Sequence, residues 1–440
     1  MKKIIQFLTS KIIYLIYLYI LIQLILIFST NIEFQRDALY YYNLAQECLN
    51  GNEFYPAKQH LHEDYIFAPL YINVLILLLK LYNAILTVAL FNILISLLQI
   101  LILYKITERL FSGNVVKVTI LLYMLYLNTL GLVLSNYTEL FFLLLISYSI
   151  LLYLQNKNYS PILSGFVLGG AIAVRPAGWA LFIAFMILHI YKGYKTRKLV
   201  PSYFYIYLGV FVFILSYGSW TYSHFGKFIF TSTTGPVNVL LGANDDATGG
   251  FNSIVYEKGK AGYIEYPDSL TYIQKGEFYQ DQAITWIKEN PLRWLTLAPL
   301  KLVHAFGWDD IAISSLFGFN DVNFARVIRI LLLEKDIDKA LPNTTLFTKL
   351  IYFLILILHH IFYYLLLITI VLGIYSLLKN RKSNDGINLI LVFSLLSVLI
   401  LIITVGSPRY KYPLFILLLP FAAYYIQAKL DNKVPVADNE

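Results

Sequence analysis

The sequence predicts an all-α polytopic membrane protein with about ten transmembrane helices, in a range of about nine to twelve. Of its 440 residues, 58% are hydrophobic and only 14% are charged, whereas a soluble domain is about 25% charged. Apolar runs close to the ~20 residues that cross a bilayer recur along most of the chain. The sequence lacks the ten-residue segments of alternating apolar and polar residues that are typical of outer-membrane β-barrels. This composition excludes a soluble enzyme and a disordered chain, and Cys48, the single cysteine, excludes an internal disulfide.

The chain is expected to begin with a span and a polar loop. The first span covers residues 11–28, and because no small-residue cleavage site follows it, we interpret it as uncleaved. Residues 29–65 form a first loop that carries juxtamembrane helices. Residues 66–81 are apolar but short, which makes them marginal as a span.

Further spans and one large loop are expected after this segment. Residues 161–191 are apolar but are interrupted at Arg175-Pro176, and proline disfavours the helical conformation of the residue before it. Residues 221–349 form a large loop, in which residues 281–288 have a helical pattern. The other predicted spans cover residues 84–104, 115–134, 138–154, 203–220, 350–378, 387–405 and 414–426.

These elements predict four regions. They are an N-terminal transmembrane catalytic module (residues 1–220), a loop domain (221–349), C-terminal transmembrane helices (350–427) and a cytoplasmic tail (428–440).

Basic residues between the apolar segments indicate the orientation. The net charge is +8, but much of the positive excess lies in short loops, where Lys and Arg favour the cytoplasmic side. We therefore expect the lipid bilayer to be the partner of these charges, and we expect no nucleic-acid partner. If residues 66–81 span fully, the cluster around Lys105 falls outside. If they insert only partly and residues 161–191 form two short helices, every cluster lies inside, with both termini. We favour this second topology, which places the two large loops outside.

Two carboxylates are candidates for catalysis. Asp37 follows the first span, where it could act as a general base at the bilayer surface or be an ordinary solvated acid. Glu139 lies at the start of a span, where an acid is costly and often functional. The alternative for Glu139 is a favourable position in the first turn of a helix.

Three basic residues are candidates for binding an anion. Arg175 lies where two apolar halves meet, so its guanidinium needs an anion. A substrate could supply it, or Asp37 or Glu139 could supply it in a structural salt bridge. Arg409 and Lys411 lie just before the last span and could bind a phosphate, or simply anchor the helix at the interface. In the favoured topology, these residues and the two carboxylates meet on one face of the membrane.

The first loop supplies further candidates. We expect Arg36, Lys58, His62 and Tyr71 to contribute to substrate binding, since they lie in this loop or where the chain re-enters the membrane. His60 and His62, with two acids after them, match no strong metal motif. No metal is therefore expected to be required, and a divalent metal remains an open alternative.

The order of short motifs resembles the C-type glycosyltransferase superfamily, and within it the branch of the protein O-mannosyltransferases and the lipid A aminoarabinose transferase. The resemblance covers most of the chain, to about Pro420. Its motifs are Asp37 with the Tyr-rich segment and Gly51 after it, Ala68-Pro69-Leu70-Tyr71, Ser135 to Glu139, Gly165 to Pro176, Leu241 to Asn244, Ala247 to Gly250, Ala283 to Trp286, Asn290-Pro291, Lys301, Arg409-Tyr410, Pro413 and Pro420.

This resemblance implies a sugar transferase that uses a polyprenyl-phosphate donor and a lipid, glycan or protein acceptor. It implies that Asp37 accepts the acceptor's proton or orients the acceptor. Arg175, Arg409 and Lys411 would hold the leaving phosphate, and Glu139 would support the donor sugar or act as a second carboxylate. A single inverting displacement is expected.

The implied location is a bacterial cytoplasmic membrane, with the active site on its outer face. Two alternatives remain open. One is a polymerase or ligase that uses a lipid-linked oligosaccharide, and the other is a polytopic transporter or flippase, in which intramembrane charges line a pathway.

Overall fold

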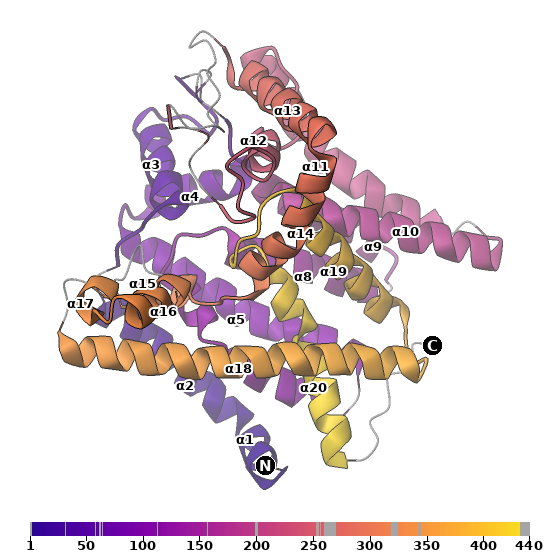
Figure 1. Cartoon of the computed structure of the whole chain (residues 1–440). Coiled ribbons are helices and arrows are strands. Elements are labelled where there is room, and N and C mark those ends of the chain that lie inside the picture. Colours follow the sequence, from indigo (N-terminus) through magenta and orange to yellow (C-terminus); the bar gives the residue numbers. More distant parts are fainter. Residues whose placement is uncertain are drawn as a thin grey trace.

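The computed structural model describes residues 2–30, 32–57, 59–60, 63, 65–111, 113–155, 157–198, 201–251, 255, 257–258, 270–317, 324–341 and 345–431. The N-terminal half is a series of helices (Figure 1). They are α1 (Lys2–Ser10), α2 (Ile12–Ser29), α3 (Asp37–Asn50), α4 (Pro69–Leu81), α5 (Ile85–Leu110), α6 (Val115–Leu125), α7 (Asn128–Val133), α8 (Glu139–Gln155), α9 (Ser160–Val174), the 3-10 turn η2 (Pro176–Gly178), α10 (Trp179–Thr196) and α11 (Pro201–Phe225).

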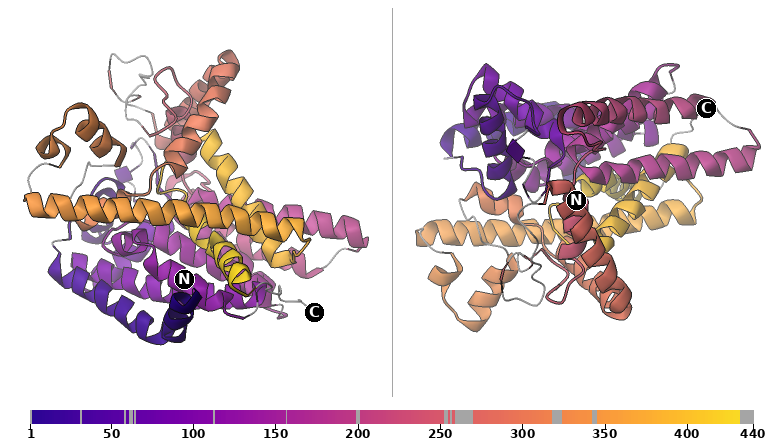
Figure 2. Two further views of the ribbon diagram at one scale, coloured as in Figure 1. Left: turned by 60° about the horizontal axis from the view of Figure 1, so that its bottom comes forward. Right: turned by 90° about the horizontal axis from the view of Figure 1, so that it is seen from above.

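The large loop contains helices that lie outside the main bundle. The left view of Figure 2 shows two of them, α13 and α14, rising from the bundle. The loop comprises α12 (Thr234–Leu241), α13 (Tyr272–Glu289), α14 (Pro291–Phe306), α15 (Ile311–Leu316), α16 (Phe324–Leu333) and α17 (Ile337–Ala340), and the chain ends with α18 (Leu346–Lys379), α19 (Asp385–Ile403) and α20 (Tyr412–Asp431).

The predicted all-α polytopic membrane fold is confirmed. Among the described residues, seven segments are long and apolar enough to cross a membrane, and four further apolar helices have 10–17 residues. The predicted break also occurs where expected, because α9 ends at Val174 and η2 begins at Pro176. The segment expected to insert only partly forms the 13-residue helix α4.

The predicted single span over residues 115–134 is wrong, because the chain leaves the helical conformation at Tyr126 and forms two helices. Tertiary contacts of the second helix, α7, account for this break. The side chain of Asn128 donates to the carbonyl of Asp309 at 3.1 Å, and the hydroxyl of Thr129 lies 3.0 Å from that of Tyr412. A Cβ on Gly131 would lie 1.9 Å from the carbonyl oxygen of Ala312, so α7 and α15 pack in close backbone contact.

Glycines allow α9 and α11 to pack closely. A Cβ on Gly165 of α9 would lie 1.9 Å from the carbonyl oxygen of Ile206, and one on Gly209 of α11 would lie 2.3 Å from that of Ile162. Small residues at helix contacts are a common means of packing in membranes, where apolar burial gives little driving force. This contact lies in the N-terminal half of α9, and the helix runs from it to Arg175.

Backbone hydrogen bonds connect the large loop to two other segments on the same side of the bundle. The amide of Thr233 donates to the carbonyl of Ile66 at 2.9 Å, and the amide of Ile66 donates to the Thr233 hydroxyl at 2.8 Å. The amide of Gly406, between α19 and α20, donates to the carbonyl of Gly249 at 2.9 Å. Three segments that are far apart in sequence therefore form one surface.

Candidate functional site

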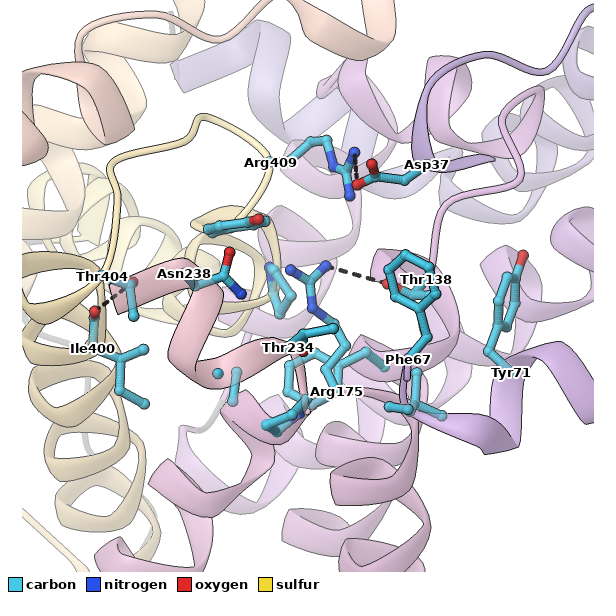
Figure 3. Close-up of a pocket in the computed structure, with 18 of the residues that line it drawn as sticks. Asp37, Phe67, Tyr71, Thr138, Arg175, Thr234, Asn238, Ile400, Thr404 and Arg409 are labelled. Atoms are coloured by element: carbon cyan, nitrogen blue, oxygen red, sulfur yellow. Dashed lines mark hydrogen bonds and ion pairs between the residues drawn. The ribbon is translucent and has the colours of Figure 1, made fainter. Parts of the chain in front are cut away.

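A cavity of about 330 Å³ lies where these segments meet. Figure 3 shows Asp37, Arg175 and Arg409 in its wall, together with polar residues from the large loop. One part of the wall is polar and comes from α3, the α9–η2 connection and the connection before α20, whereas the apolar part comes largely from α4, α8 and α19. The residues that line the cavity include Asp37, Tyr41, Tyr65, Phe67, Tyr71, Thr138, Arg175, Thr234, Asn238, Phe251, Phe393, Ser397, Ile400, Thr404, Arg409 and Tyr410.

Asp37 is held in place from both sides. It is the first residue of α3, and Arg36 before it adopts a left-handed conformation with φ of 49°. The side chain of Asn136 donates to the carbonyl of Ala38 at 2.9 Å and accepts from the Tyr71 hydroxyl at 2.7 Å. Asn136 therefore connects the start of α3 to α4 and to the segment that precedes Glu139.

Glu139 is fully buried behind the cavity wall. One of its oxygens, Oε1, lies 2.5 Å from Nη1 of Arg175 and 2.8 Å from Nε of Arg409. The other oxygen, Oε2, has no hydrogen-bond partner among the described residues. A buried carboxylate is stable only when it is paired, so the two guanidinium groups explain how Glu139 is accommodated.

Arg409 contacts both carboxylates. Its Nη1 lies 2.9 Å from Oδ2 of Asp37, while its Nε contacts Glu139. Its guanidinium carbon lies 4.0 Å from the centre of the Tyr137 ring. Burial opposes the charge, but the Glu139 and Asp37 carboxylates raise the pKa of Arg409 well above its ordinary value. Arg409 is therefore cationic at every physiological pH.

Arg175 is the second cation of the cluster. Its Nη1 also donates to the Thr138 hydroxyl at 3.3 Å, and its guanidinium carbon lies 4.9 Å from the Tyr410 ring. Burial lowers the pKa of Arg175, but the Glu139 carboxylate, together with Tyr410 and Tyr41, raises it above its ordinary value. Two guanidinium charges against the Glu139 carboxylate leave one positive charge, which the Asp37 carboxylate balances.

The structure brings four of the candidate residues together and separates others from them. Asp37, Glu139, Arg175 and Arg409 form one ion-paired chain, and Tyr71 lines the same cavity. Arg36 is exposed and is not among the lining residues, and Lys411 is buried in an ion pair with Asp309, 3.0 Å away. Lys58 and His62 lie outside the described residues.

Sequence reasoning missed the apolar wall of the cavity. Ser397 and Ile400 of α19 line it, and so does Thr404 directly after this helix, although this segment was expected to be an ordinary span. The polar Ser397, three residues before Ile400 on the same face of a very apolar helix, was the available signal. Asn238 and Thr234 of α12 carried no such signal, because their position depends on how the large loop folds back.

Solved structures of one protein resemble this fold. The Archaeoglobus fulgidus oligosaccharyltransferase in complex with Zn and sulfate matches with a TM-score of 0.50 and 13% identity, covering 94% of this chain and 49% of that chain. The chain shares the fold of this oligosaccharyltransferase. The same protein with an inhibitory peptide and a dolichol-phosphate matches with a TM-score of 0.47 and 14% identity, covering 96% and 50%. This chain therefore spans about half the length of the protein that it matches.

Comparisons of sequence gave no further relatives. No family model and no curated protein matches the chain. The predicted resemblance is thus confirmed at the level of the fold, through three-dimensional structure rather than through sequence similarity.

The residues described here do not suit a metal ion. Among them, no group of three or more His, Cys, Asp and Glu side chains could hold one. Each carboxylate of the cluster is paired with an arginine, so the local charge is already balanced without a cation.

Proposed function

We propose that the chain is a membrane glycosyltransferase that moves a sugar from a polyprenyl-phosphate donor to an acceptor on the outer face of the membrane. The observation that carries this proposal is the position of Arg409. It bridges the fully buried Glu139 carboxylate and the half-buried Asp37 carboxylate at the wall of the cavity. Another part of this wall is the apolar helix α19. A phosphate attached to a lipid needs this combination of cations and apolar surface.

The leaving phosphate would bind to the two guanidinium groups. As the bond between the anomeric carbon and the phosphate oxygen breaks, negative charge collects on the phosphate. Arg175 and Arg409 would stabilise this charge, because both are preorganised by Glu139 and largely shielded from water. The guanidinium group is well suited to this role, since its planar array of donors matches phosphate oxygens.

Asp37 would act on the acceptor. The acceptor oxygen attacks the anomeric carbon from the face opposite the phosphate, which inverts the configuration, and its proton passes to the Asp37 carboxylate. If the acceptor is itself a phosphate, no proton needs to be removed and Asp37 orients it instead. Asp37 is the exposed acid of the cluster, with 46% of its side chain accessible, so an acceptor can reach it.

The rest of the cavity would divide between the lipid and the acceptor. Apolar residues of α19, such as Phe393 and Ile400, would contact the first units of the prenyl chain. Tyr65, Asn238 and Phe251 come from the first and the large loop and would contact the acceptor. The acceptor's identity would then depend on the large loop, and a lipid, a glycan and a protein all remain candidates.

Purified protein in lipid nanodiscs tests this proposal. With a set of synthetic polyprenyl-phosphate sugars and a membrane extract as acceptor, the expected result is transfer of the sugar and release of polyprenyl phosphate. Asp37→Asn and Arg409→Ala should each lower transfer by about 100-fold or more. Glu47→Gln and Arg293→Gln are matched controls, because both residues are exposed and Arg293 pairs with Asp245 outside the cavity. Full activity of Asp37→Asn would contradict its assignment.

The products distinguish the two alternatives. Release of a polyprenyl diphosphate would indicate a polymerase or ligase that uses a diphosphate-linked oligosaccharide. Movement of an intact lipid across the nanodisc or vesicle membrane, with no free polyprenyl phosphate, would indicate a flippase.

A further inference from the structure

A second buried cluster of ionisable side chains lies two residues from Arg409. Lys411 is completely buried, and its Nζ lies 3.0 Å from Oδ1 of Asp309. The other oxygen of Asp309 lies 3.0 Å from Nε2 of His359 on α18. Lys411 also donates to the carbonyl of Ala305 at 2.9 Å and to that of Trp308. None of these residues lines the cavity.

This cluster satisfies a buried lysine almost completely. The three Nζ hydrogens have three acceptors, from Asp309, Ala305 and Trp308, and the Tyr363 ring lies 4.7 Å away. Burial alone would raise the pKa of Asp309, but Lys411 and His359 lower it to about 2. Asp309 is therefore ionised and forms a charged pair with Lys411. This pair holds the Lys411 side chain in one position.

The connection joins three parts of the chain. Asp309 lies between α14 and α15 of the large loop, His359 lies in α18, and Lys411 lies between α19 and α20. Asp309 is anchored further, because its carbonyl accepts from Asn128 at 3.1 Å and its amide donates to His360 at 3.3 Å. Displacing the lysine would therefore require several elements to move together.

A short hydrogen-bonded turn links Lys411 to Arg409. The amide of Tyr410 donates to the carbonyl of Ser407 at 3.1 Å, and the amide of Tyr412 donates to the carbonyl of Arg409 at 3.1 Å. Pro408 lies within this turn and restricts its backbone. Because the backbone of this turn is held in this way, the position of Lys411 constrains the position of Arg409. Lys411 points into the protein, while Arg409 faces the cavity.

We propose that Asp309, Lys411 and His359 are positioning residues that fix Arg409 for the anionic head of the lipid donor. This inference rests on the proposed function. It assigns Lys411 a role away from the phosphate, and it makes the large loop, through Asp309, part of the device that shapes the anion site. A donor phosphate would then bind to a cation whose place is already set, which reduces the cost of ordering it on binding.

Binding of decaprenyl phosphate to the protein in nanodiscs tests this inference. Asp309→Asn should weaken the binding of decaprenyl phosphate roughly tenfold. The control is Asp338→Asn, because Asp338 pairs with another buried lysine, Lys349 of α18, away from the cavity. This control should bind decaprenyl phosphate within about twofold of the unmodified protein.

A double-mutant cycle separates positioning from general destabilisation. In an Arg409→Ala background, Asp309→Asn should cause no further loss of binding, because the residue that it positions is gone. If Asp309→Asn does not fold, the double variant Asp309→Asn/Lys411→Met, which leaves no unpaired buried charge, replaces it with the same expectation.

The possible outcomes distinguish this inference from the proposed function. Equal additional losses in both backgrounds, or unchanged binding in Asp309→Asn, would overturn the positioning role and leave the proposed function intact. Unchanged binding in Arg409→Ala alone would overturn the proposed anion site, and the inference with it.

Discussion

At the residue scale, the geometry of Arg409 requires an arginine. Its Nε contacts Glu139 and its Nη1 contacts Asp37, so one planar group holds two carboxylates in a fixed relation. A lysine has the same charge but only one nitrogen, which cannot occupy both positions. The separation between the two acids therefore depends on the shape of this side chain as well as on its charge.

Arg409→Lys tests this dependence. We expect folded protein with sugar transfer lowered by about 100-fold, as for the removal of one preorganised donor. Arg293→Lys, which alters an exposed ion pair with Asp245, is the control. Transfer at the unmodified rate in Arg409→Lys would show that charge alone is sufficient. Size-exclusion chromatography in detergent checks that both variants fold.

The candidate residues could be predicted from the sequence, and so could the pairing of Arg175 with Glu139 as one alternative, but the bridging position of Arg409 could not. Asp37, Glu139 and Arg175 stood out because charged side chains at the ends of apolar segments are costly. The contact between Glu139 and Arg409 joins residues 270 positions apart, and no spacing along the chain predicts it. The same reasoning selected Lys411, which is buried against Asp309 because the α14–α15 connection folds over it.

At the scale of elements, close backbone contact joins α11 to α9, the helix that ends next to Arg175. Gly165 allows the two backbones to touch, since any Cβ there would overlap the carbonyl of Ile206. The spans and the Arg175-Pro176 break could be predicted because apolar length and proline are local signals. The break between α6 and α7 could not, because it depends on contacts with Asp309 and Tyr412.

Gly165→Ala should therefore destabilise the protein, although alanine is the better helix former. We expect a loss of about 1–3 kcal/mol, since the two helices must separate to admit the methyl group. Thermal unfolding in detergent measures the effect. The matched control is Gly193→Ala in α10, where the nearest atom would lie 3.7 Å from the new Cβ, and it should be neutral or stabilising. Equal effects of the two substitutions would contradict this explanation.

At the scale of the whole molecule, Lys301 joins the large loop to the end of α19. It is completely buried, and its Nζ donates to the carbonyl of Ile402 at 2.9 Å. Two glycines lie against Lys301. A Cβ on Gly242 would lie 2.9 Å from the Lys301 Nζ, and a Cβ on Gly406 would lie 2.0 Å from the Lys301 carbonyl oxygen. Burial lowers the pKa of Lys301 to about 8.

This low pKa predicts how stability depends on pH. Between about pH 8 and the ordinary lysine pKa of 10.5, the unfolded chain binds the proton more strongly than the folded protein does, so stability should rise with pH. Lys301→Met should lack this increase. Thermal unfolding of both proteins from pH 7 to about pH 9.5 measures the difference, and parallel curves would contradict the assignment.

The length of α18 has a consequence for the lipid environment. Its 34 residues extend about 51 Å at 1.5 Å per residue, whereas the hydrocarbon layer of a bilayer is about 30 Å thick. Its first turns expose Leu346 and Phe347, while Tyr352 and Leu356 pack against α16 and α17 of the large loop. The excess length is therefore accommodated by tilt or by contacts with the loop beyond the hydrocarbon layer. Because His359 of α18 contacts Asp309, the placement of this helix and that of the α14–α15 connection depend on each other.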